Sequence, residues 1–106
     1  MLAMHQLIES KRREIEDICR RFGVRRLEVF GSAARGYDFD PKTSDADFMV
    51  QFRSISDIDP LGEFLGFEAE LSRLLDREVD LIEGLSVKNP FLQKAIDRDR
   101  QLIYVA

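Results

Sequence analysis

The sequence predicts an α/β (α+β) domain in which helices flank a small mixed β-sheet. Three observations support this fold class: apolar residues recur at helical spacing near the N-terminus, short strand-like segments follow, and Gly, Pro, Asn and Asp separate strands from helices. The chain has 106 residues, of which 44% are hydrophobic and 34% charged, and this is typical of one globular domain. We therefore expect a single domain over residues 1–106.

The first half of the chain predicts one helix, one strand and a short helical turn. Apolar residues spaced three and four apart predict a helix over residues 4–21, closed by Gly23. VRRLEVF, residues 24–30, predicts the first strand. SAARG, residues 32–36, is rich in helix formers and predicts a helical turn, and the polar stretch at 37–44 predicts a loop.

The middle of the chain predicts a second strand and the longest helix. DADFMVQF, residues 45–52, is strand-like, with Asp45 and Asp47 on one face and the aromatic residues on the other. Asp59 followed by proline predicts the capped start of a helix over residues 60–76. The apolar stripe of that helix is expected to consist of Leu61, Phe64, Leu65, Leu71, Leu74 and Leu75.

The last part of the chain predicts a third strand, a short helix and an extended end. EVDLI, residues 78–82, is a strand stopped by Gly84. A helix over residues 89–99 is expected to begin at the cap Asn89, and residues 101–106 are expected to be extended. The order is helix, strand, helical turn, strand, helix, strand, helix.

Composition narrows the function classes. The net charge is −4, and the acidic excess lies in residues 36–106, whereas residues 1–35 carry a positive balance. This argues against general nucleic-acid binding, although the basic residues could face nucleotide phosphates or an acidic partner. The single cysteine cannot form an internal disulfide, and no apolar run reaches membrane-spanning length. We therefore expect a cytoplasmic protein without a membrane segment.

Three aspartates are candidate metal ligands. Asp45 and Asp47 are two residues apart, so on extended backbone both side chains leave the same face. Asp80 interrupts an apolar strand, where a lone carboxylate is costly to bury without a partner. Three carboxylates around magnesium would explain both features. Surface acids at strand starts are the alternative interpretation.

Gly31 and Ser32 follow a strand and open a helical turn, which directs backbone N–H groups beyond the sheet edge. Glycine lets a phosphate approach closely, the serine hydroxyl can donate to it, and Arg35 adds a cation. A tight turn with a capping serine is the alternative. The chain contains neither a Walker-type loop nor the G-x-G-x-x-G pattern of dinucleotide-binding proteins.

Together these motifs resemble the DNA polymerase beta-type nucleotidyltransferase superfamily, and within it the minimal nucleotidyltransferase (MNT) family of antitoxins. The matching segments are Gly31-Ser32, Ala34-Arg35-Gly36, Ser44-Asp45-Ala46-Asp47 and Asp80. Two features depart from the family pattern. Twelve residues separate the Gly-Ser pair from the first aspartate, a longer spacing than the family usually has, and Ala46 replaces the usual Leu or Ile.

The resemblance implies the polymerase beta-like fold and transfer of AMP from ATP to a protein hydroxyl. The acceptor would be a tyrosine of a HEPN toxin, and the modification would inactivate that toxin. Two Mg²⁺ ions would assist the transfer. Four residues would bind the nucleotide: Gly31, Ser32, Arg35 and Ser44. Three would be catalytic and bind the metal, with Asp80 also helping to deprotonate the acceptor: Asp45, Asp47 and Asp80.

Two other functions stay open at this stage. A non-catalytic antitoxin could neutralise its toxin by binding alone, and the apolar excess around Phe64 and Phe67 suggests an exposed partner-docking patch or a homo-oligomer contact. A nucleotidyltransferase acting on a small molecule would need a further domain to hold the acceptor, which this length does not provide. His5 is expected at a helix start rather than in a catalytic site, and Cys19 in the core.

Overall fold

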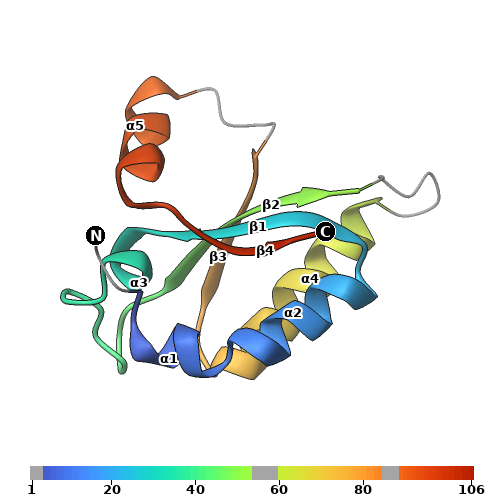
Figure 1. Ribbon diagram of the computed structural model, residues 1–106, viewed down its shortest axis with the longest axis horizontal. Coiled ribbons are helices and arrows are strands. Elements are labelled where there is room, and N and C mark those ends of the chain that lie inside the picture. Colours follow the sequence, from blue (N-terminus) through green and yellow to red (C-terminus); the bar gives the residue numbers. More distant parts are fainter. Residues whose placement is uncertain (1–3, 54–59, 85–88) are drawn as a thin grey trace.

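The computed structural model describes residues 4–53, 60–84 and 89–106. In Figure 1 helices lie on both sides of one β-sheet. The predicted cap at Asp59 lies outside the described residues. None of the described helices is long and apolar enough to cross a membrane. The elements are α1 (Gln6–Ser10), α2 (Arg12–Arg21), β1 (Val24–Phe30), α3 (Gly31–Arg35), β2 (Ala46–Phe52), α4 (Pro60–Leu75), β3 (Val79–Glu83), α5 (Pro90–Asp99) and β4 (Gln101–Val105).

The sheet is mixed, and its strand order is β3-β2-β1-β4. β1 pairs antiparallel with β2 and with β4, whereas β2 pairs parallel with β3. The parallel pair is connected through α4, because parallel neighbours need a crossover. The predicted fold class and the extended C-terminal segment are both confirmed.

The single helix predicted over residues 4–21 is wrong, because the structure has two helices with Lys11 between them. The Ser10 hydroxyl donates to the Leu7 carbonyl at 3.1 Å, a local bond that competes with helix continuation. The break lets α1 turn and bury Ile8 completely, while α2 runs on its own axis (Figure 1). Periodicity survives such a break, so the pattern alone did not reveal it.

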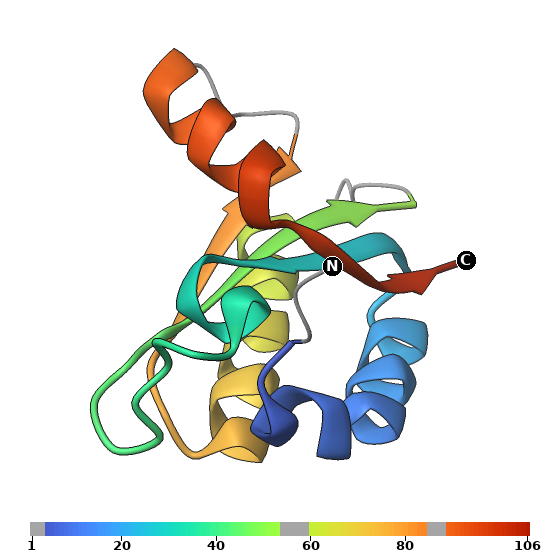
Figure 2. The ribbon, with the colours of Figure 1, turned by 60° about the vertical axis from the view of Figure 1, so that its left-hand side comes forward.

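The two faces of the sheet are covered differently. In both ribbon views α2 and α4 lie on one face, and α5 lies on the other (Figures 1 and 2). The face toward α2 and α4 carries the main apolar core, which includes Leu27, Val29, Phe48, Val50, Phe67 and Leu71. The α5 face carries a small cluster of buried apolar residues, consisting of Phe30, Met49 and Ile96. Most of the apolar packing is therefore on one side.

The buried stripe of α4 differs from the prediction in two places. Leu61 and Leu65 are 66% and 50% exposed, so assigning them to the core was wrong. The predicted exposed patch at Phe64 and Phe67 is also wrong, because Phe67 is fully buried and Phe64 packs partly against the core. The centre of the Phe67 ring lies 5.7 Å from that of Phe22, so the side of α4 that carries Phe67 faces the core. The predicted burial of Leu71 and Leu75 is confirmed.

Candidate active site

The site begins where β1 ends at Phe30 and α3 starts at Gly31. Gly31 has a φ of +69°, a left-handed conformation that side chains with a Cβ rarely adopt. A Cβ at this position would lie 2.5 Å from Oδ2 of Asp47. The absence of a side chain therefore lets the first turn of α3 approach the Asp47 carboxylate directly.

The strand register brings the predicted aspartates together. Phe30 pairs with Asp47 across β1 and β2, and Asp47 pairs with Asp80 across β2 and β3. Paired residues on neighbouring strands point to the same face of a sheet, and the strands lie about 4.8 Å apart. Asp45 directly precedes β2, two residues before Asp47. The register therefore brings Asp47 and Asp80 together, as a shared magnesium site requires, and their role as metal ligands stays a prediction.

The electrostatics of Asp47 reflect this crowding. Burial, followed by the charges of Asp80 and Asp45, raises the pKa of the half-buried Asp47 to about 6, and Arg35 partly offsets the rise. In the part of the chain that the structure describes, none of the three aspartates forms an ion pair. The three carboxylates therefore form an acidic cluster without a counter-charge bound to it.

The carboxylates provide oxygen ligands of the kind that Mg²⁺ prefers. Among the described residues, however, no three acidic, His or Cys side chains are arranged to hold one ion in common. Magnesium is commonly bound by one or two carboxylates together with substrate phosphates. The donor set thus fits a metal shared with a nucleotide better than a metal cage made by protein alone.

Among the predicted nucleotide-binding residues, Ser32 and Arg35 both lie on α3. Ser32 is half-buried and its hydroxyl makes no hydrogen bond within the described residues. The Arg35 guanidinium is engaged: it donates to buried Asp99 at 2.6 Å and pairs with Asp38 at 2.7 Å. Arg35 therefore fastens α3 to the end of α5.

Ser44 lies one residue before the acidic cluster begins. Its hydroxyl accepts a hydrogen bond from the Asp40 N–H at 2.8 Å, and its carbonyl accepts one from Arg77 at 3.0 Å. Both bonds hold the loop at residues 37–44 closed. The structure thus gives Ser44 a place at the edge of the cluster and a role within the loop.

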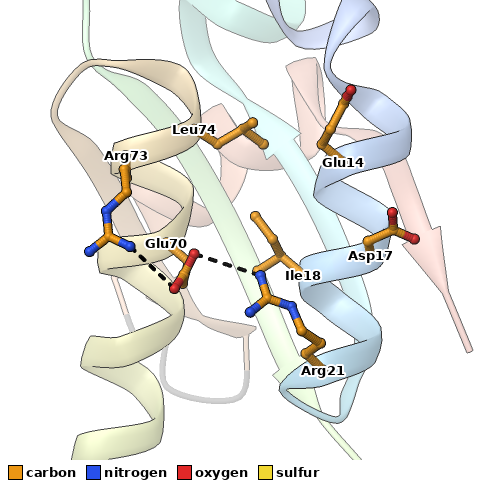
Figure 3. A pocket seen from close by; sticks show the side chains of 7 residues that line it. All are labelled: Glu14, Asp17, Ile18, Arg21, Glu70, Arg73 and Leu74. Carbon is orange, nitrogen blue, oxygen red and sulfur yellow. Dashed lines mark hydrogen bonds and ion pairs between the residues drawn. The ribbon is translucent and has the colours of Figure 1, made fainter.

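Two cavities differ in whether predicted site residues line them. One, of about 500 Å³, is lined by Arg35, Tyr37, Asp38, Arg98 and Asp99, beside α3. The other, of about 340 Å³, lies between α2 and α4 on the opposite side of the sheet. Figure 3 shows its charged rim, where Glu70 pairs with arginines from both helices, over Ile18 and Leu74. None of the predicted site residues lines this second cavity.

Sequence reasoning missed two residues that fix the loop beside the cluster. Phe39 is only 5% exposed and packs in the main core, and the Arg77 guanidinium lies 4.7 Å from the centre of its ring. A single apolar residue within the polar stretch YDFDPKTS was the available signal for Phe39. Arg77 carried none, because its contacts depend on the turn between α4 and β3.

Comparison with known proteins agrees with this geometry. A family profile described as "Polymerase beta, Nucleotidyltransferase" matches residues 13–106. The protein adenylyltransferase MntA of Thermococcus cleftensis is 31% identical over 105 residues, which covers 99% of this chain and 98% of that protein. A Methanocaldococcus jannaschii relative, MJ1379, also named as a protein adenylyltransferase, is 32% identical over 105 residues, covering 99% of this chain and 100% of its own.

Solved structures share the fold. A minimal nucleotidyltransferase superposes with a TM-score of 0.68 at 28% identity, covering 89% of this chain and 90% of its own. A toxin-antitoxin crystallised with AMP-PNP superposes with a TM-score of 0.67 at 20% identity, covering 90% and 73%. The predicted resemblance and fold are therefore confirmed. The chain belongs to the polymerase beta-type nucleotidyltransferase family, among the minimal nucleotidyltransferases that act as protein adenylyltransferases.

Proposed function

We propose that this protein is a magnesium-dependent antitoxin that transfers AMP from ATP to a tyrosine hydroxyl of a HEPN toxin. One observation carries the proposal: the register places Asp47 beside Asp80, with Gly31 against the Asp47 carboxylate. The homologue MntA is named a protein adenylyltransferase. A structural neighbour at 17% identity is a tri-AMPylated Shewanella oneidensis HEPN toxin in complex with MNT antitoxin.

In this proposal the turn at Gly31 and Ser32 holds the triphosphate. The left-handed glycine lets the turn lie directly against the Asp47 carboxylate. The Ser32 hydroxyl, which makes no hydrogen bond among the described residues, can donate to a phosphate there. Ser44 and Arg35 complete the nucleotide site from the loop and from α3. Because Arg35 is paired with Asp38 and Asp99, its contribution is mainly to hold α3 in place.

Asp45, Asp47 and Asp80 would hold the metal together with phosphate oxygens. Bound magnesium would supply neutralisation of the charge on the α-phosphate and the leaving pyrophosphate. The acceptor oxygen attacks the α-phosphorus, the bond to pyrophosphate breaks, and the Asp80 carboxylate takes up the hydroxyl proton. The exposure of Asp80 fits this role, because an acceptor from another protein must be able to reach it.

The test uses the purified chain, α-labelled ATP, Mg²⁺ and the product of the neighbouring gene. We expect label on the toxin and loss of its ribonuclease activity. Asp80→Asn should abolish the transfer, whereas Glu83→Gln, a carboxylate substitution three residues further along β3, should leave it intact. An unlabelled toxin, or equal transfer by wild type and Asp80→Asn, would exclude the proposal.

Neutralisation by binding alone is a second candidate, supported by exposed apolar side chains. Phe91 is 82% exposed at the start of α5, and Leu61 and Leu65 are exposed on α4. The double substitution of Asp45 and Asp47 by alanine separates the two functions. Toxin inhibition that survives this change favours occlusion, and inhibition that disappears favours AMP transfer.

A further inference from the structure

The turn between α4 and β3 is held in one conformation. Asp76 has a φ of 53°, and the Arg77 N–H donates to the Ser72 carbonyl at 3.3 Å. This is the arrangement of a Schellman motif, in which the second residue past the helix bonds back to its last turn. The Ser72 hydroxyl also donates to the Arg77 carbonyl at 2.6 Å. These bonds fix the backbone of Arg77 independently of the contacts that its side chain makes.

The Arg77 side chain reaches from this turn to the loop at residues 37–44. Its Nη2 donates to the Pro41 carbonyl at 2.7 Å, and its Nη1 to the Ser44 carbonyl at 3.0 Å. The guanidinium carbon also lies over the Phe39 ring, 4.7 Å from its centre. A side chain that donates to two carbonyl groups and lies over a ring at the same time needs the planar, multi-donor guanidinium group, which a lysine ammonium does not provide.

The loop is fastened from its other side as well. Phe39 is buried, and its ring centre lies 4.6 Å from that of His5. Within the loop, the Asp40 carboxylate accepts from the Lys42 N–H at 2.8 Å, and the Asp40 carbonyl accepts from the Ser44 N–H at 2.9 Å. Arg77 thus anchors a segment that is already folded on itself, rather than a loose chain.

The anchor lies next to both halves of the acidic cluster. The Ser44 carbonyl held by Arg77 belongs to the peptide that leads into Asp45. On the other side Arg77 is followed by Glu78, whose carbonyl accepts the Ala46 N–H at 3.1 Å, and Asp80 comes two residues later. Arg77 therefore bridges the entry of β2 and the entry of β3.

We propose that Arg77 is a positioning residue that sets Asp45 relative to Asp80, so that the magnesium–nucleotide complex can bind. The proposal rests on the proposed function for its reaction, but its geometry stands on the contacts of Arg77 alone. Twelve residues separate the Gly-Ser pair from the first aspartate, and Arg77 ties the end of this segment to the start of β3. Arg77 touches neither substrate nor metal in this assignment.

The test compares Arg77→Lys and Arg77→Ala with Arg73→Ala. Arg73 lies on α4, four residues before Arg77, its side chain is 76% exposed, and its contact with Glu70 is 3.5 Å. Hydrogen exchange reports the loop, through amides such as that of Ser44. Calorimetric titration with AMP-PNP reports binding, with and without Mg²⁺. Circular dichroism shows that each variant is folded.

For both Arg77 variants we expect faster exchange at residues 37–44. We also expect AMP-PNP affinity in the presence of Mg²⁺ to fall by about 10–100-fold, the usual effect of losing a group that orients metal ligands. Without Mg²⁺ the affinity should change little, and Arg73→Ala should match wild type throughout. If Arg77→Ala does not fold, Arg77→Lys decides the question, since it retains the charge and most of the side-chain volume.

Three results would overturn the inference: unchanged loop exchange in Arg77→Lys, unchanged magnesium-dependent affinity, or an equal loss of affinity with and without Mg²⁺. Failure of the proposed function looks different. In that case the wild type would transfer no AMP to the toxin, while the binding and exchange measurements would still decide the role of Arg77.

Discussion

The two faces of the sheet differ in what they bury. The face toward α2 and α4 buries apolar side chains almost exclusively, whereas the face toward α5 carries carboxylates and arginines around a small apolar cluster. Buried Glu28, on β1, pairs with Arg26 at 3.1 Å and with Arg100 at 3.3 Å. Asp47, on the neighbouring strand, has no ion-pair partner in the described parts of the chain.

This difference separates stability from chemistry. The chain itself supplies counter-charges for Glu28, so that this carboxylate is a structural group. Among the described residues it supplies none in contact with Asp47, whose pKa is raised first by burial and then by the charges of Asp80 and Asp45. A carboxylate that the fold leaves unpaired beside two others is suited to a cation that arrives with the substrate.

The largest expected effect tests the core face. Phe48 and Met49 are adjacent on β2 and point to opposite faces. Phe48→Ala should lower the free energy of unfolding by about 3–5 kcal/mol, and Met49→Ala by about 2 kcal/mol, because fewer apolar neighbours surround the second site. Urea unfolding of both variants measures the difference. Equal losses would show that the two faces contribute alike.

Asp47→Asn tests the active face. We expect kcat for AMP transfer to fall on the order of 10²–10³-fold, as when one electrostatic group of an active site is removed. In metal-free buffer the free energy of unfolding should rise, by up to about 1 kcal/mol, because screening by solvent limits the repulsion that is relieved. Thermal melts in EDTA and single-turnover assays measure the two quantities. A clear loss of stability would contradict the assignment.

Glu28→Gln is the opposite case on the same face. It leaves two arginines without their carboxylate, so the free energy of unfolding should fall by about 1–2 kcal/mol. Both arginines keep access to solvent, which holds the loss below that of a fully buried pair. AMP transfer should stay near the wild-type rate at a temperature where the variant is folded. A strong loss of activity in a folded variant would place Glu28 in the active site.

The smallest effect concerns the apolar face at high pH. Burial raises the pKa of the Cys19 thiol to about 12, from a value near 9 in the unfolded chain. Between these values only the unfolded state releases the proton, so stability is full below pH 9 and falls as the pH rises toward 12. Relative to Cys19→Ala, the wild type should lose about 1 kcal/mol between pH 8 and pH 10. Parallel stability curves would refute this expectation.

Local patterns were sufficient to predict most of the fold. Alternation and turn residues gave the strands, and Asn89 caps α5 as expected, with its side chain accepting from the Phe91 N–H at 2.9 Å. They were insufficient where tertiary packing decides. The break at Lys11 depends on burying Ile8, and the burial of Phe67 depends on where α4 meets the sheet.

The site was predictable to a similar extent. The sequence suggested that Asp80 shares a magnesium site with Asp45 and Asp47, and the register pairs Asp47 with Asp80. Their role as metal ligands stays a prediction. The assignment of Arg35 to the nucleotide stays a prediction. The structure pairs Arg35 with Asp38, in a loop, and with Asp99, on α5, and no local sequence pattern indicates either contact. Arg77 was beyond sequence reasoning for the same reason.

The pairing of Asp47 with Asp80 has a consequence for the order of folding. These residues lie more than thirty positions apart, and their parallel strands are joined through α4, so that pairing them closes a long loop. Closing long loops costs chain entropy, so this contact belongs among the late events of folding. A slip of one residue would turn Asp80 to the opposite face. Chains in which these strands have not paired, or have paired out of register, would therefore lack enzymatic activity. A nucleotide that binds only the correctly paired site would stabilise the fully folded chains alone.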